Sequence, residues 1–273
     1  MKKRIVQPAD VCGLISCYQL PSFKAFVCGQ SDADVTLEKT DEQPPRGQDI
    51  IYGAIAHRRL DDGWFYHSPK TDRTGLVVSS DYTRLRMYGE ERSVMDQQQE
   101  WMVRLALECL LALRGYVSLH AAAVEVGQEA YAFSGPSGVG KSTRAGAWLR
   151  AFDDAALISG DRPLIGVSDL TLYGVPWDGK EQCFRNVSFP LKAICEVQRS
   201  DTAAVCEMSF SERRKLLMNQ CFIPMWDTDT ALTQIINITR LAKTAEIVRV
   251  FCGTSTEDAV RVHEMLQRHS DSV

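Results

Sequence analysis

The spacing of hydrophobic and polar residues changes along the chain and divides it into two parts. Up to residue 92, short runs rich in β-branched and aromatic residues alternate with polar turn clusters. This pattern predicts short strands over 25–28, 50–55, 64–66, 75–79 and 84–88. We therefore expect residues 1–92 to form a small β-rich region, an antiparallel sheet that covers or presents a substrate.

From residue 93 to residue 273, helical spacing and buried strands alternate. Apolar residues recur at four-residue steps from Trp101 to Leu113, which predicts a helix over 94–114. Further elements are expected as strands over 117–126, 130–134, 155–159, 171–173 and 247–252, and as helices over 141–152, 211–221 and 255–268. Strands that alternate with helices predict an α/β fold with a parallel or mixed sheet.

Composition narrows the classes of function. Of the 273 residues, 45% are hydrophobic and 24% charged, as in a soluble globular protein. The net charge of -4 argues against a nucleic-acid partner, which requires a basic surface. Nine cysteines without a C-x-x-C pair indicate reduced thiols and a cytoplasmic protein. Because no apolar run approaches eighteen residues, we expect no membrane partner.

A glycine-rich segment carries the strongest motif. Residues 135–142 match the pattern G-x-x-x-x-G-K-[ST] between a predicted strand and a predicted helix. The glycines permit a tight turn whose amide groups point at phosphate oxygens, and the helix start adds the positive end of its dipole. Lys141 is expected to reach the β- and γ-phosphates, and Ser142 to bind Mg²⁺. The nucleotide-binding residues predicted in this way are Gly135, Pro136, Ser137, Gly138, Val139, Gly140, Lys141, Ser142 and Thr143.

An acidic residue follows soon after this loop. The apolar strand that starts at Ala155 ends at Gly160-Asp161, only twenty residues after Lys141. One helix and one turn fill that gap, so we expect this strand to lie next to the loop strand. Ligands of open α/β sheets bind at the carboxyl ends of the strands. Asp161 is therefore a candidate Mg²⁺ ligand and proton acceptor, the alternative being a turn-capping aspartate.

His120 and four other polar residues are further candidates. His120 lies in an apolar strand and is either a satisfied core histidine or a partner of Asp161 or a phosphate that tunes proton transfer. The remaining candidates for substrate or phosphate contacts, with a solvated turn as the alternative, are Arg162, Lys180, Glu181 and Arg185.

Three segments together, residues 119–124, 135–142 and 157–162, resemble the HPr kinase/phosphorylase family of the PEP-carboxykinase-like superfamily. The resemblance is nearer to the peptide and serine kinases of peptide-modification clusters than to HPr kinase proper. It implies a PEP-carboxykinase-like P-loop core with a mixed sheet and often a homo-oligomer. It also implies that His120 is the active-site histidine and Asp161 the second aspartate of an acidic pair. Gly160 stands where HPr kinases have the first aspartate of this pair.

These features predict a Mg-ATP-dependent kinase that transfers the γ-phosphoryl group to a hydroxyl. The expected acceptor is a serine of a peptide or protein, or else a small hydroxyl-bearing molecule. In this hypothesis Ser142 and Asp161 serve Mg²⁺, and Asp161, assisted by His120, deprotonates the acceptor. The alternative is a nucleotide-binding sensor or partner subunit of a peptide-modification system without transfer activity, which Gly160 favours.

Overall fold

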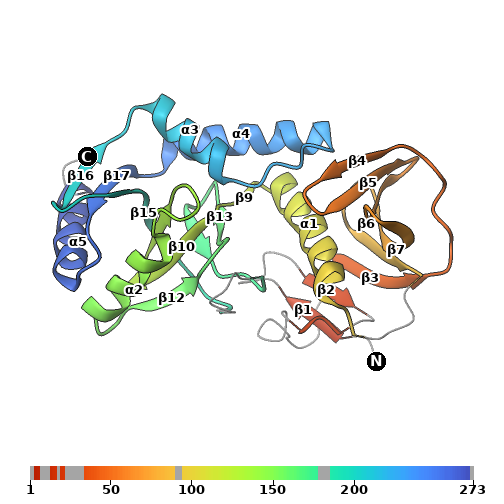
Figure 1. The fold of residues 1–273 in the computed structure, drawn as a ribbon, viewed down its shortest axis with the longest axis horizontal. Coiled ribbons are helices and arrows are strands. Elements are labelled where there is room, and N and C mark those ends of the chain that lie inside the picture. The colour runs from red at the N-terminus through yellow and green to blue at the C-terminus, as the bar shows by residue number, and fades with distance from the viewer. Residues whose placement is uncertain are drawn as a thin grey trace. The chain divides into compact units, whose positions relative to one another are not determined.

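The chain divides by its internal contacts into two units. A computed structural model describes residues 3–6, 13–16, 19–21, 34–89, 94–177 and 185–270. Unit 1 comprises Met1–Arg114 and Ile223–Thr233, and unit 2 comprises Gly115–Phe222 and Gln234–Val273. The described residues form a mixed α/β structure with two mixed sheets and five helices (Figure 1). We expected a boundary between residues 92 and 93, whereas the contacts group the next helix with the N-terminal strands.

Unit 1 is built on an eight-stranded sheet. In spatial order its strands are β1 (Lys3–Val6), β2 (Gly13–Ser16), β3 (Val35–Thr40), β8 (Arg84–Tyr88), β7 (Thr71–Val78), β6 (Gly63–Ser68), β5 (Ile55–Leu60) and β4 (Asp49–Tyr52). The expected antiparallel sheet is in fact mixed, because β3 pairs in parallel with both β2 and β8. Pairing between strands distant in sequence leaves no local signal. The predicted strand over 25–28 lies outside the described residues.

One helix, α1 (Gln97–Leu113), packs on β7 of this sheet. It begins at a capping box in which the Asp96 side chain accepts from the Gln99 amide and the Gln99 side chain accepts from the Asp96 amide. Val103 and Leu107 of its apolar residues are fully buried, whereas Trp101 and Leu113 near its ends are 36% and 42% exposed. The predicted helix over 94–114 is confirmed, and its first turn starts after the capping residue.

Unit 2 is built on a nine-stranded sheet. In spatial order its strands are β12 (Ala156–Ser159), β10 (Ala121–Val126), β11 (Glu129–Ser134), β15 (Ser188–Arg199), β14 (Thr171–Tyr173), β13 (Leu164–Gly166) and β9 (Tyr116–Ser118), with β17 (Ile247–Cys252) paired to β15 and β16 (Ala204–Glu207) paired to β17. The neighbours β11, β15 and β17 are parallel, whereas β10 is antiparallel to β11 and β12.

Helices of unit 2 pack on this sheet and on one another. The helices α2 (Lys141–Ala151) and α5 (Thr256–Ser270) contact each other, α2 also contacts β10 and β11, and α5 also contacts β16 and β17 (Figure 1). Trp148 of α2 lies between Tyr131 and Phe133, with ring centroids 4.8 and 5.2 Å away. The other helices are α3 (Phe210–Gln220) and α4 (Thr228–Thr244), and α4 begins with residues of unit 1. This core fixes β11 and α2, which carry the phosphate loop.

The strand expected next to the loop strand lies one strand further away. β10 lies between β11 and β12 and is joined to β11 by a tight turn in which Gly127 and Gln128 both have positive φ. β11 and β12 are therefore parallel to each other, and their carboxyl ends lie at the same edge of the sheet. The expected adjacency was wrong because a helical crossover spans two strand spacings as readily as one. The predicted strand over 117–126 is two strands, β9 and β10, separated at His120.

Candidate functional site

The phosphate loop joins β11 to α2. Gly135, Gly138 and Gly140 have φ angles of 143°, 79° and 103°, a region that favours glycine. A Cβ atom on Gly140 would lie only 2.7 Å from Nη1 of Arg144. Gly140 is the N-cap residue of α2 and provides no side-chain hydrogen bond. No capping side chain therefore competes with an anion for the amide groups of the first helical turn.

Lys141 is folded back over this loop. Its side chain is largely buried, with the residue 8% exposed, and Nζ donates to the carbonyl oxygens of Gly135 at 3.0 Å and Pro136 at 3.3 Å. Burial lowers the pKa of Lys141; the charge of Asp161 opposes the shift and that of Arg162 adds to it. These electrostatic effects place both residues near the ammonium group. Among the described residues, Lys141 is thus hydrogen-bonded to loop carbonyls alone, which a phosphate group can replace.

Two arginines that the sequence analysis did not single out hold the loop in place. Arg199, at the end of β15, donates from Nη2 to the carbonyl of Gly138 at 2.7 Å and from Nε to that of Val139 at 3.4 Å. Arg144 donates from Nη2 to the carbonyl of Cys252 at 2.6 Å, which ties α2 to β17. No motif marks these residues, because their partners come from distant strands.

His120 and Asp161 meet at the edge of the sheet where the loop begins. His120 Nε2 lies 3.5 Å from Asp161 Oδ1, and the two side chains are 28% and 30% exposed. The backbone fixes both residues: the amide of Ala121 donates to the carbonyl of Asp161 at 2.8 Å, and the amide of His120 donates to that of Gln220 at 2.8 Å. Ser134, the last residue of β11, donates from its hydroxyl to the carbonyl of His120 at 3.0 Å. The antiparallel strand β10 thus places His120 between the loop and Asp161.

The environment of His120 favours its neutral form. Burial lowers the pKa of His120, and the positive charges of Lys141 and Arg162 lower it further. The charge of Asp161 and a hydrogen bond with Gln220 oppose this shift without reversing it. At neutral pH the ring therefore has one nitrogen able to accept a proton.

Arg162 completes a group of four charged or titratable side chains. Its charge contributes to the lowered pKa values of both His120 and Lys141, so the guanidinium lies near both. Its Nη1 atom is buried and has no hydrogen-bond partner within the described part of the chain. A buried, unpaired guanidinium nitrogen is costly and is suited to binding an anion. The structure therefore brings together Lys141, His120, Asp161 and Arg162.

Arg185 is not part of this group. It donates from Nη1 to the carbonyl of Leu157 and from Nη2 to Oε1 of Glu125, both at 2.8 Å. Glu125 lies four residues from Ala121 along β10, about 13 Å from the loop end of that strand. The guanidinium thus links β12 to β10 instead of facing the loop. Two other candidate contacts, Lys180 and Glu181, lie outside the described residues.

A polar pocket of about 230 Å³, here called the loop-side pocket, adjoins the phosphate loop. Its lining includes Pro136, Glu196, Glu212, Lys215, Asn219 and Gln220. Arg249 also lines it and binds both carboxylates, with Nε 2.6 Å from Glu196 Oε2 and Nη1 3.2 Å from Glu212 Oε1. Sequence reasoning missed this pocket, because it predicted the helix over 211–221 but carried no signal that brings Glu196 and Arg249 from distant strands to it.

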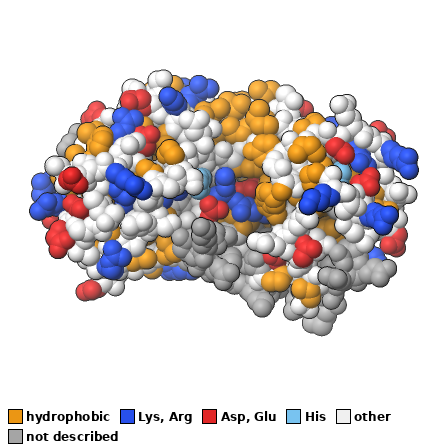
Figure 2. All heavy atoms as spheres, in the orientation of Figure 1, with side chains coloured by type: hydrophobic (Ala, Val, Ile, Leu, Met, Phe, Trp, Pro, Cys, Tyr) orange, Lys and Arg blue, Asp and Glu red, His pale blue; other side chains and the backbone are white. Residues whose placement is uncertain are grey.

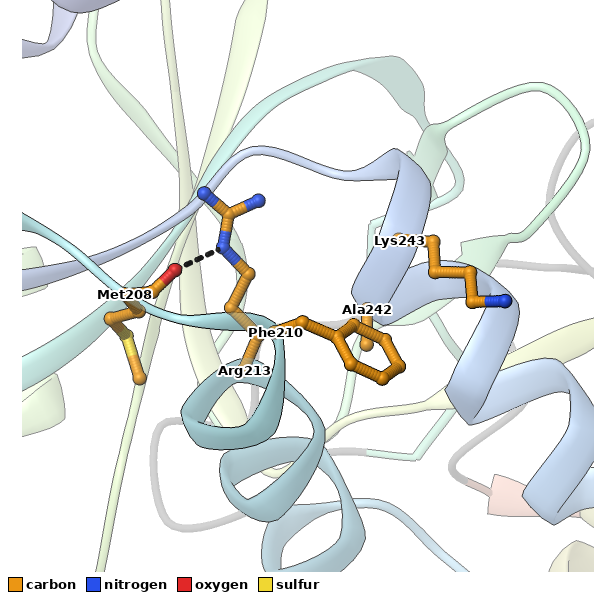
Figure 3. Close-up of a pocket in the computed structure, with 5 residues that line it drawn as sticks. All are labelled: Met208, Phe210, Arg213, Ala242 and Lys243. Atoms are coloured by element: carbon orange, nitrogen blue, oxygen red, sulfur yellow. Dashed lines mark hydrogen bonds between the residues drawn. The ribbon is translucent and has the colours of Figure 1, made fainter.

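A second pocket, of about 420 Å³, lies between α3 and α4 and shares no lining residue with the phosphate loop. In Figure 3 the Phe210 ring lies over Ala242, and Arg213 donates from Nε to the carbonyl of Met208 at 2.9 Å. Lys243 Nζ lies 5.8 Å from the centroid of the Phe210 ring. This α3–α4 pocket is more open than the loop-side pocket and carries no acidic lining residue.

The oxygen atoms of Ser142 and Asp161 suit Mg²⁺, which needs few protein ligands, better than they suit a metal ion bound by protein side chains alone. Within the described ranges, no group of three or more His, Cys, Asp or Glu side chains is arranged to hold a metal ion. Mg²⁺ usually takes one or two protein oxygens and completes its octahedron with phosphate oxygens and water. One hydroxyl at the start of α2 and one carboxylate after β12 match that donor set.

Neither the surface charges nor the comparison with known proteins identifies a function. On the face drawn in Figure 2, Lys and Arg side chains are interspersed with Asp and Glu, without an extended basic stripe. Among the described helices, none has the length and apolar character that a bilayer crossing requires. The sequence matches no protein-family model. A search of curated proteins likewise gives no match.

Proposed function

We propose that this protein is a Mg-ATP-dependent kinase that transfers the γ-phosphoryl group to a hydroxyl, most naturally a serine of a peptide or protein. The main observation in favour is the pairing of His120 with Asp161, 3.5 Å apart, beside the lysine of a phosphate loop. The PEP-carboxykinase-like core and the likeness to HPr kinase-type enzymes belong to the same proposal. A loop for phosphates and a proton acceptor next to it are the two parts that phosphoryl transfer requires.

The phosphate loop supplies the nucleotide site. The glycines of the loop have positive φ and no Cβ atom, so a phosphate can approach the loop amides closely. The positive end of the α2 dipole adds to the attraction. When a triphosphate binds, Lys141 exchanges the carbonyls of Gly135 and Pro136 for phosphate oxygens. Ser142 and Asp161 would hold Mg²⁺, which would supply positive charge to offset that of the phosphates.

His120 and Asp161 handle the proton of the acceptor. The attacking hydroxyl gives its proton to Asp161, and neutral His120, with Nε2 3.5 Å from that carboxylate, can then take the proton from Asp161. A new bond then forms between the hydroxyl oxygen and the γ-phosphorus, the bond to the β-phosphate oxygen breaks, and ADP leaves. Arg162, whose buried Nη1 has no hydrogen-bond partner among the described residues, offsets the charge that develops on the transferred group.

The variant Asp161→Asn tests this assignment with two readouts. We expect phosphoryl transfer from ATP to serine peptides to fall by about a hundredfold or more, the usual range for loss of a catalytic base. The ATP dissociation constant should change by less than about threefold, because the amide oxygen of Asn can still ligate a cation and the backbone carbonyl that binds the Ala121 amide is retained. Asp154→Asn, which alters an exposed carboxylate at the other end of the same sheet, is the matched control.

A specific substitution favours the second candidate, a nucleotide-binding sensor or partner subunit without transfer activity. Gly160 stands where HPr kinases have the first aspartate of the acidic pair, so one carboxylate of that pair is missing beside Asp161. If wild-type protein binds ATP tightly and forms no ADP with any serine peptide, this second function replaces the kinase. If Asp161→Asn leaves a measurable transfer rate unchanged, Asp161 is not the base.

A further inference from the structure

The loop-side pocket lies where an acceptor of the proposed kinase has to bind. Pro136 of the phosphate loop lines it, and so does Gln220, whose carbonyl receives the His120 amide and whose side chain bonds the His120 ring. Glu196 of the lining is opposite Ser134 in the parallel pairing of β11 with β15. The pocket therefore adjoins both the phosphate-binding turn and the residue next to the proton acceptor.

The size of the pocket suits a side chain better than a nucleotide. About 230 Å³ equals the volume of about eight water molecules in the liquid, at about 30 Å³ each. That space is below the range of about 300–1,000 Å³ that is usual for small-molecule pockets. A hydroxyl-bearing side chain with part of its neighbour fits this volume.

Two carboxylates and two cations line the pocket, and among the described residues one of these cations makes no direct ion pair. Arg249 binds the carboxylates of both Glu196 and Glu212, so these two acids share an internal counter-ion. Within the described part of the chain, Lys215 makes no ion pair and the Asn219 side chain makes no hydrogen bond. The two residues are four apart in α3, so both point to one face of the helix. Together they offer an ammonium group and an amide donor to a carboxylate.

We propose, on the basis of the kinase function above, that the loop-side pocket binds the acceptor and that Lys215 selects peptides with a carboxylate beside the target serine. Lys215 is thus a specificity residue and not part of the phosphate site. Because Lys215 is exposed, its ion pair is screened by water, and an effect of about threefold to fivefold on affinity is expected.

The test measures peptide binding, so that it does not depend on phosphoryl transfer. Wild-type protein with Mg²⁺ and a non-hydrolysable ATP analogue is titrated with fluorescent peptides that have blocked ends and carry either Glu or Lys beside one serine. A third peptide ends in serine with a free carboxylate, which separates a chain-terminal carboxylate from a side-chain one. We expect both carboxylate-bearing peptides to bind about threefold to fivefold more tightly than the lysine peptide.

Charge reversal then locates the effect. Lys215→Glu should invert the preference between the Glu and Lys peptides, whereas Lys243→Glu, the same change at the α3–α4 pocket, should leave it intact. An unchanged preference in Lys215→Glu, a preference for the lysine peptide in wild type, or binding of no peptide overturns the inference. Binding with the expected preference but without any transfer leaves the inference standing and removes the kinase. Phosphoryl transfer without a charge preference supports the kinase function and overturns the inference about Lys215.

Discussion

Each unit contains a histidine whose pKa is lowered by burial, yet the surroundings of the two differ. His57 of unit 1 is fully buried, and its ring stacks on Trp226 with centroids 3.9 Å apart and packs edge-on to Tyr66 at 4.6 Å. His120 of unit 2 keeps 28% of its side chain exposed and faces Asp161. Burial lowers the pKa of His57 to about 4 and also dominates the lowered pKa of His120.

The difference shows that a shifted pKa does not by itself mark a functional site. His57 is surrounded by aromatic rings that leave no room for a reactant, so its neutral form serves packing. His120 combines a neutral ring with a carboxylate, a nearby ammonium group and access to solvent. Only the second arrangement can exchange a proton with a bound molecule.

Removal of the His120 ring should have the largest effect and should act on rate alone. We expect His120→Ala to lower phosphoryl transfer to serine peptides by about a thousandfold, within the range for acid–base catalysis. The free energy of unfolding should change by less than about 1 kcal/mol, because the side chain is partly exposed and the backbone bond to Gln220 remains. ADP formation and urea unfolding measure the two quantities. A transfer rate within threefold of wild type would remove His120 from the mechanism.

His57 should instead make stability depend on pH. Its ordinary pKa of 6.5 applies to the unfolded chain and about 4 to the folded one, so unfolded protein binds the proton first as the pH falls. The free energy of unfolding has its full value above pH 6.5. It decreases by about 1.36 kcal/mol per pH unit below that, or by about 3 kcal/mol as the pH approaches 4. His57→Phe keeps a ring on Trp226 but cannot titrate. Urea unfolding at pH 7, 5 and 4 should therefore show a smaller loss in this variant, and equal losses would contradict the assignment.

The smallest effect, on ATP affinity, is expected from the arginine that supports the phosphate loop. Arg199→Met removes the hydrogen bonds to the carbonyls of Gly138 and Val139 and should weaken Mg-ATP binding by about threefold to tenfold. Arg84→Met removes an exposed arginine of unit 1 that is paired with Asp62 and should leave ATP binding unchanged. Calorimetric titration compares the two variants. Equal affinities would show that Arg199 does not support the loop.

The sequence predicts those parts of the site that are local in the chain. The phosphate loop is a contiguous motif, and the strand and the helix on either side of it are present as β11 and α2. His120 and Asp161 could be named because His120 lies within an apolar run and Asp161 at the end of another, both close to this loop. The strand arrangement behind their contact was predicted incorrectly, because β12 was expected next to β11 and β10 lies between them.

Parts that depend on distant segments were missed. β15, the strand next to β11, includes Pro190 and Lys192 in its first half, which interrupt the expected alternation. Consequently Arg199 and Glu196 could not be placed beside the loop. α4 is rich in Thr and Ile, which have modest helix propensity, so its helical pattern was not recognised. Its formation depends on burial of residues such as Ile238 and Leu241.

Product analysis is the most direct test of a kinase site at the phosphate loop. Wild-type protein and Lys141→Ala are incubated with Mg-ATP and the serine peptides, and the peptides are then examined by mass spectrometry while ADP is quantified. We predict that wild-type protein adds one phosphoryl group to serine with an equal amount of ADP. Lys141→Ala should lose this product together with about a hundredfold in ATP affinity. ATP binding that depends on Lys141, without a phosphopeptide from any serine peptide, would contradict the account.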